Sequence, residues 1–244
     1  MRAILRMELE AETAQELSRL QTEADGLRAA GVLQPTDHWK NHRTSPSILG
    51  ALAALKRMAG QRQRCMYCVD SLGPDIEHFW PKTPYPMQMY VWENLLLVCT
   101  DCGRKKGSQF PLSAAGQPLL IDPTSEDPWE FLDFDPVTGN LNARYLLSTE
   151  KYSAKGETTV KVLHLNRREG VSASYLVTYT RLCRLVGRWA DEGLPDNYVE
   201  RLREEDERGL LGWFLHSTGQ NESAFSRFRG EYPEAWADCQ QAFH

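Results

Sequence analysis

Apolar residues recur at helical spacing near both ends of the chain, whereas the middle follows a different pattern. Thr13 and Glu16 form a capping-box pair, which predicts the start of a first helix. The apolar stripe after this pair predicts that the helix continues toward Gly31 through Leu17, Leu20, Ala24 and Leu27. Ser45-Pro46 can start a second helix, which is expected to end at Gly60.

Two further apolar stripes lie in the last third of the chain. The first consists of Tyr179, Leu182, Cys183, Val186 and Trp189. The second is interrupted near Pro233 and consists of Phe225, Phe228, Tyr232 and Trp236. Asn166 and Glu169 could cap the start of this region, so we expect helices from about Asn166 onward. Cys183 and Cys239 fall on apolar helical faces and are expected to be core residues.

The middle of the chain combines cysteines, prolines and aromatic residues with short apolar runs. Residues 95–98 predict a short strand, and residues 129–134 and 141–147 predict a β-hairpin around Thr138-Gly139-Asn140. The pattern therefore divides the chain into residues 1–60, 61–145 and 146–244. The expected fold class is α+β, with a small central module embedded between helical N- and C-terminal regions.

The composition sets wider limits on what the protein can be. A chain of 244 residues, 41% hydrophobic and 25% charged, has the composition of a globular protein with one or two domains. Its net charge of −5 argues against a protein that coats nucleic acid, but a nuclease needs basic groups only in one cleft. We see neither a signal peptide nor an apolar run of the roughly 18 to 20 residues that span a membrane. We therefore expect a cytoplasmic protein that does not contact membranes.

The cysteines give the clearest chemical signal. Cys65 and Cys68 form one CxxC pair, Cys99 and Cys102 form another, and 30 residues separate the two pairs. Such pairs supply the four thiolates of a structural zinc site, and free thiols suit a reducing compartment. The alternative is that these are buried or redox-active cysteines. We expect structural zinc, whose closed coordination leaves hydrolysis to other residues.

The residues between the cysteine pairs are those that phosphodiester hydrolysis requires. His78 could take a proton from water as a general base, and Glu77 could hold a magnesium or manganese ion. The side-chain amide of Asn94 could hold the loop or orient the imidazole. A basic run after the last cysteine could bind phosphate at the start of a helix: Arg104, Lys105 and Lys106.

These motifs resemble an HNH endonuclease of the ββα-metal type with a zinc-binding cysteine tetrad. Glu77-His78 resembles the acidic residue and catalytic histidine that end its first strand, and Asn94 resembles its middle asparagine. Further segments resemble the PtuB-like HNH proteins of Septu and retron anti-phage defence systems: Met1-Arg-Ala-Ile4, Phe79-Trp-Pro-Lys82, Trp92-Glu-Asn-Leu-Leu-Leu97, Ile121-Asp-Pro123 and Val162-Leu-His-Leu-Asn166.

The resemblance implies a function for each part of the chain. Residues 61–145 would be the HNH module with its zinc tetrad and a following hairpin, and residues 146–244 could dock a partner. The chain would be the nuclease subunit beside an ABC- or SMC-like ATPase, with DNA favoured over RNA as substrate. Lys82 would join the basic run in binding substrate phosphates.

One position departs from the family pattern. Gly103 stands where the family carries asparagine or histidine as a second ligand of the catalytic cation. Asp101 or Asp122 could replace that ligand, water could fill the position, or the nuclease could be weak or inactive.

Other functions remain open from the sequence. A catalytically degenerate zinc adaptor that binds nucleic acid or protein is the main alternative, and a zinc-ribbon redox protein is another. His38 and His42 are four residues apart and could bind a metal on one helix face, or lie on a solvated, partly aromatic surface.

Overall fold

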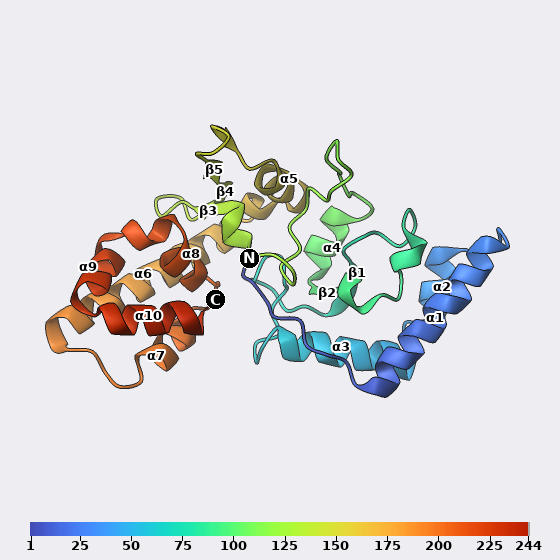
Figure 1. Ribbon diagram of the computed structural model, residues 1–244, viewed down its shortest axis with the longest axis horizontal. Helices are drawn as coiled ribbons and strands as arrows, with labels where there is room; N and C mark the ends of the chain where they lie inside the picture. The colour runs from blue at the N-terminus through green and yellow to red at the C-terminus, as the bar shows by residue number, and fades with distance from the viewer. Residues whose placement is uncertain (244) are drawn as a thin grey trace. The chain divides into compact units, whose positions relative to one another are not determined.

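The computed structural model describes residues 1–243, which form two compact units. The N-terminal unit comprises Ile4–Pro118, and the C-terminal unit comprises Met1–Ala3 together with the chain from Leu119 onward. Both combine helices with very small sheets (Figure 1), so the predicted α+β class is confirmed. The predicted division into three parts stays a prediction.

The N-terminal unit places three helices before a hairpin and a short final helix. Its elements are α1 (Ala11–Ala29), α2 (Pro35–His42), α3 (Pro46–Met58), β1 (Asp75–His78), the 3₁₀ turns η1 (Pro86–Gln88) and η2 (Trp92–Asn94), β2 (Leu95–Val98) and α4 (Thr100–Lys106). Strands β1 and β2 pair antiparallel, with His78 opposite Leu95 and Asp75 opposite Val98. All four residues of β2 are buried, because α3 packs against this strand.

Helix α3 begins and ends where its sequence predicts. The Ser45 side chain accepts a hydrogen bond from the Ile48 amide at 3.4 Å, and Pro46 occupies the first helical position. The helix ends before Gly60, whose φ of 79° is the left-handed conformation that glycine tolerates best.

The predicted start of the first helix is wrong. Helix α1 begins two residues before Thr13, and its N-cap, Glu10, makes no side-chain capping bond. Thr13 instead lies against α3, where a Cβ on Gly50 would stand 2.8 Å from the Thr13 hydroxyl oxygen. Packing between α1 and α3 therefore uses the threonine that the local pattern assigned to a cap.

The C-terminal unit joins two small hairpins to a helical array. It contains η3 (Pro128–Glu130), β3 (Leu132–Phe134), β4 (Leu141–Ala143), β5 (Tyr145–Leu146), β6 (Lys151–Tyr152), α5 (Ala154–Leu163), η4 (Leu165–Arg167), α6 (Glu169–Glu192), α7 (Tyr198–Glu205), α8 (Leu211–His216), η5 (Thr218–Asn221), α9 (Ser223–Glu231) and α10 (Pro233–Ala242). Strands β3 and β4 form the predicted hairpin, and Pro233 separates α9 from α10 as predicted.

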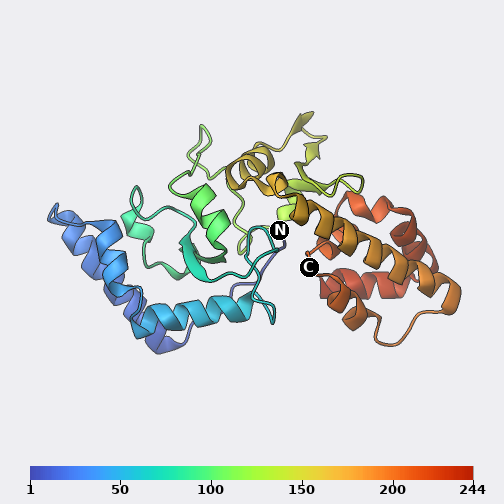
Figure 2. The ribbon, with the colours of Figure 1, turned by 180° about the vertical axis from the view of Figure 1, so that it is seen from behind.

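Long helix α6 organises the core of the C-terminal unit. It packs against α9, and the two lie side by side in Figure 1 and in the reverse view of Figure 2. Phe214 and Phe225 stack with ring centroids 3.8 Å apart, and Tyr179 stacks on Phe214 at 5.7 Å. This aromatic core confirms that the C-terminal stripes are buried faces.

The predicted cap of α6 is wrong. Asn166 lies in η4, and its side chain bonds to both backbone groups of Leu141, at 2.9 Å and 2.8 Å. Helix α6 begins at Glu169 behind the N-cap Arg168. No helix within residues 1–243 is long and apolar enough to cross a membrane.

Candidate functional site

The two cysteine pairs meet inside the N-terminal unit. Cys65 and Cys68 precede β1, whereas Cys99 is the N-cap of α4 and Cys102 lies in its first turn. All four are buried, and their sulfur atoms lie within 4.8 Å of one another. The sulfur atoms of Cys68 and Cys99 are 3.8 Å apart. Tetrahedral zinc with bonds of about 2.3 Å would separate two sulfurs by about 3.8 Å, so the cluster fits a metal ion such as zinc.

Backbone hydrogen bonds hold the two segments that carry the cysteines. The Cys102 amide donates to the Cys99 sulfur at 3.4 Å, and the Val69 amide donates to the Cys65 carbonyl at 2.9 Å. Val69 has a φ of 53°, an uncommon value for a β-branched residue, directly after a cysteine. Burial raises the pKa of the Cys65 thiol, so a bound cation would be needed to hold several thiolates together.

Glu77 and His78 end strand β1 and point to different surroundings. Their partners across the hairpin are Leu96 and Leu95. The His78 residue is 4% exposed, and the Glu77 side chain is 18% exposed. Both side chains are therefore largely shielded from water, so neighbouring groups decide the protonation of the imidazole and of the carboxylate.

The imidazole of His78 is fixed on two sides. Its Nε2 lies 3.0 Å from the carbonyl oxygen of Met89, so Nε2 carries the proton and Nδ1 keeps its lone pair. The Trp39 ring meets the imidazole edge-on with centroids 4.4 Å apart. Burial, assisted by the positive charge of Lys82, lowers the pKa of His78 to about 3. The ring is therefore neutral at ordinary pH, and a negative phosphate nearby would raise this pKa.

Lys106 is the direct partner of Glu77. Its ammonium donates to Glu77 Oε1 at 2.9 Å and to the His78 carbonyl at 2.7 Å, and the side chain is fully buried. Burial raises the pKa of Glu77, and the ammonium of Lys106 acts in the opposite direction. The other carboxylate oxygen faces Gly103, where an added Cβ would lie 3.5 Å from it.

Asn94 holds the loop that carries the Met89 carbonyl. Its Nδ2 donates to the carbonyls of Trp80 and Gln88, at 3.0 Å and 2.7 Å. Its Oδ1 accepts from the Trp80 amide at 2.6 Å. Because Gln88 precedes Met89, the amide of Asn94 supports the histidine through the loop rather than by direct contact.

The prediction that the basic run stands at the start of a helix is wrong, because Arg104, Lys105 and Lys106 lie in the last turn of α4, which begins at Thr100. The residues predicted to bind phosphate also differ in environment. Arg104 is exposed, and Lys82 is half-buried. The Lys105 side chain is 24% exposed and pairs with Asp101 at 3.1 Å. Lys106 could reach a phosphate only by leaving Glu77, so its predicted phosphate contact stays a prediction.

The residues that could replace a ligand at Gly103 have other contacts. Asp101 pairs with Lys105, and Asp122 belongs to the C-terminal unit, where it accepts from the amide and hydroxyl of Thr124 at 2.9 Å and 2.7 Å.

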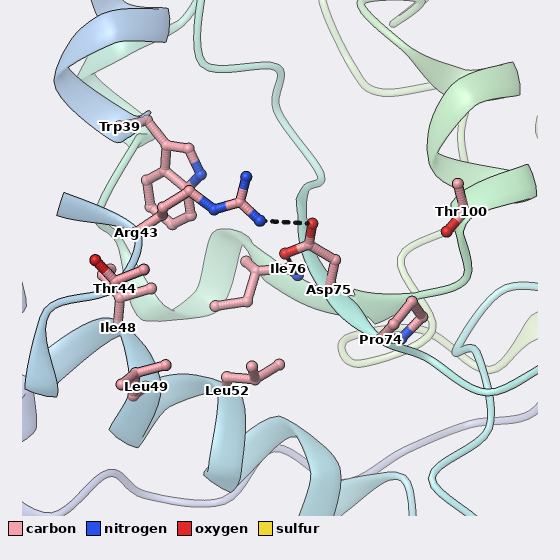
Figure 3. Close-up of a pocket in the computed structure, with 10 residues that line it drawn as sticks. All are labelled: Trp39, Arg43, Thr44, Ile48, Leu49, Leu52, Pro74, Asp75, Ile76 and Thr100. Atoms are coloured by element: carbon pink, nitrogen blue, oxygen red, sulfur yellow. Dashed lines mark hydrogen bonds and ion pairs between the residues drawn. The ribbon is translucent and has the colours of Figure 1, made fainter. Parts of the chain in front are cut away.

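A cavity lies beside β1 in the same unit. Its volume is about 390 Å³, and Trp39, Asp75 and Ile76 line it together with residues of α3 (Figure 3). Arg43 reaches across it to Asp75 at 3.5 Å. Trp39 thus borders both this cavity and His78.

Sequence reasoning missed two groups that position His78. Met89 acts through its backbone carbonyl, which leaves no signal in residue identity. Trp39 lies four residues from Arg43 on the α2 segment, and nothing in its local pattern connects it with residue 78.

Curated proteins similar to this chain include two named Septu protein PtuB. The one from Bacillus thuringiensis is 34% identical over 109 residues, which cover 43% of this chain and 37% of that protein. The one from Bacillus mycoides (strain KBAB4) is 32% identical over 136 residues, covering 43% of this chain and 44% of that protein. The chain thus matches less than half of each relative's length. No protein-family model and no solved structure matches the chain.

The expected resemblance to PtuB proteins is therefore confirmed over part of the chain. The names of these relatives associate them with Septu and state no chemical activity.

Proposed function

We propose that this chain is a metal-dependent HNH endonuclease and the nuclease subunit of a bacterial anti-phage defence complex. The observation that carries the proposal is the environment of His78. A neutral imidazole at the end of β1 is held by a backbone carbonyl, next to a carboxylate and two lysines. The order β1, β2, α4, with the thiol cluster beside it, is the arrangement expected of a ββα-metal nuclease.

The residues support hydrolysis in the following way. Nδ1 of His78 takes a proton from water, and the resulting hydroxide forms a bond to phosphorus. The bond from phosphorus to the 3′ oxygen breaks, and the departing oxygen takes a proton from solvent. A magnesium or manganese ion on Glu77 would neutralise charge on the phosphate. Lys82, Arg104 and Lys105 supply positive charge for the backbone of the nucleic acid.

The partner belongs to the same proposal. Similarity to Septu PtuB proteins supports a two-protein system, in which an ABC- or SMC-like ATPase controls cleavage. The C-terminal helices, which carry no candidate catalytic residue, are the proposed docking region. We propose DNA rather than RNA as the substrate.

A cleavage assay tests the proposal. The purified chain, alone and with the product of the neighbouring gene as the proposed ATPase, is incubated with DNA or RNA with and without magnesium. We expect magnesium-dependent cleavage that His78→Ala reduces by about 10²- to 10⁴-fold, because a general base contributes about that much. His164→Asn removes a histidine from the C-terminal unit at a left-handed position (φ 49°) and should leave cleavage unchanged. Normal cleavage by a folded His78→Ala protein would contradict the mechanism.

A zinc adaptor without catalysis is the second candidate. The Glu77–Lys106 ion pair favours it, because a buried ammonium already occupies one oxygen of Glu77, the residue proposed to hold the catalytic cation. Magnesium-independent binding of nucleic acid or partner, without cleavage under any condition, would favour this function.

A further inference from the structure

Three potential metal ligands meet on the N-terminal unit away from the cysteines. Glu23 lies on α1, whereas His38 and His42 lie one turn apart on α2. One ligand atom from each falls within 4.8 Å of the others. Helices α1 and α2 lie side by side in both views (Figures 1 and 2). The carboxylate that completes this cluster is 15 residues before His38, so only the fold reveals it.

The hydrogen bonds of His38 leave one nitrogen ready for a metal. Its Nδ1 lies 2.8 Å from the hydroxyl of Tyr90, and that hydroxyl donates to the His38 carbonyl at 3.4 Å. A tyrosine has one hydroxyl proton, and when that proton goes to the His38 carbonyl, Nδ1 donates to the hydroxyl oxygen and Nε2 carries the lone pair. Nε2 is buried without a hydrogen-bond partner among the described residues, and it faces Glu23 Oε1 at 3.6 Å.

We propose that Glu23, His38 and His42 form a second metal site, separate from the cysteine cluster, for a divalent transition-metal ion such as zinc. Imidazole and carboxylate ligands suit such ions, and three protein ligands leave a position for water. Two ligand atoms about 2.0 to 2.1 Å from a tetrahedral ion lie about 3.4 Å apart, close to the observed distance between Nε2 and Oε1. Tyr90 supports the ligand in the way that carbonyls and carboxylates support metal-bound histidines.

The site has a structural consequence for α2. This helix makes no side-chain N-cap bond, and it carries Trp39, whose ring packs against His78. A metal shared by α1 and α2 ties the short helix to the longer one. It thereby fixes Trp39 over the histidine that is central to the proposed function.

Metal titration of the purified chain tests the site. Cobalt(II) added to the metal-stripped protein should bind as two equivalents. One should show the near-ultraviolet band of cobalt–thiolate bonds, and the other should lack it. His42→Ala and Glu23→Gln should each weaken only the second equivalent by at least about 100-fold, since even residues that merely support ligands contribute about 10- to 100-fold.

Glu16→Gln is the matched control. Glu16 lies on the same helix and shares Arg19 with Glu23, yet it is not part of the cluster, so this variant should bind both equivalents. Hydrogen exchange should slow in α2 when the second equivalent binds. A wild-type chain with no thiolate-free equivalent, or retention of that equivalent by both ligand variants, would overturn the proposal. The cobalt–thiolate band reports on the cysteine cluster, and the cleavage assay reports on His78. Failure of the second metal site can therefore be told apart from failure of the cysteine site or of the proposed nuclease activity.

Discussion

At the scale of single residues, Gly103 is the position with the clearest testable consequence. Gly103 lies inside α4. A Cβ added there would lie 3.5 Å from Glu77 Oε2 and 3.6 Å from a methyl group of Val98, which are ordinary contact distances. Gly103→Asn should therefore fold and place an amide oxygen beside Glu77. We expect it to lower the metal concentration for half-maximal cleavage by about tenfold, roughly 1.4 kcal/mol.

Gly103→Ala provides the control for this change, because it alters the helix in the same way without adding a ligand. Magnesium titrations of the three proteins decide the outcome. An unchanged requirement in folded Gly103→Asn would mean that another residue or water already completes the site.

Lys106 and Arg104 should respond differently to substitution, although the sequence places them in one basic run. Lys106→Met would leave the carboxylate of Glu77 without its ammonium partner in a mostly buried position. We expect a loss of about 3 kcal/mol in the free energy of unfolding, measured by denaturant titration. Arg104→Ala, at an exposed position, should change stability by less than about 0.5 kcal/mol.

Nucleic-acid binding gives the complementary measurement. Arg104→Ala should reduce the slope of log affinity against log salt by about one phosphate contact. In the unfolding experiment, equal stability of Lys106→Met and Arg104→Ala would show that the Glu77–Lys106 pair is not a structural contact in solution.

At the scale of elements, the cysteine cluster joins α4 to the chain before β1. Cys99→Ser should release the metal and unfold this part of the N-terminal unit, because metal binding in such sites contributes about 10 kcal/mol to folding. Serine can still cap α4, so the effect would report on metal rather than on capping. Metal analysis and thermal melting provide the test.

Cys239→Ser is the matched control, since this cysteine is also buried but lies on α10. It should keep the wild-type metal content. A Cys99→Ser protein with full metal content and an unchanged melting temperature would exclude the cluster as a metal site.

At the scale of the whole molecule, the two units have cores of different origin. The N-terminal unit contains the buried cysteine cluster, whereas the C-terminal unit contains stacked aromatic residues such as Phe214 and Phe225. A strong chelator should therefore remove protection from hydrogen exchange in β2 and α4 while α6 and α9 stay protected. Simultaneous loss of protection in both units would show that they unfold as one.

Local patterns predicted the elements well where the relevant contacts are local. Ser45-Pro46 and Gly60 mark α3 because caps act within one turn, and Pro233 separates two helices because it cannot donate a backbone hydrogen bond. The pattern wrongly predicted helix caps at Thr13 and Asn166, because the Thr13 side chain packs against a distant segment and the Asn166 side chain bonds to one. A capping residue and a tertiary contact look alike in sequence.

The sequence by itself determined the chemical parts of the candidate site: the cysteine pairs, Glu77-His78, Asn94 and the basic run. Residue type and spacing fix these, because thiolates, imidazoles and carboxylates have intrinsic chemistry. Only the tertiary structure decided their surroundings. It placed Lys106 on Glu77, the Met89 carbonyl on His78 and Glu23 beside two histidines. Those contacts join residues far apart in the chain, and burial and distance, which set protonation and coordination, exist only once the chain has folded.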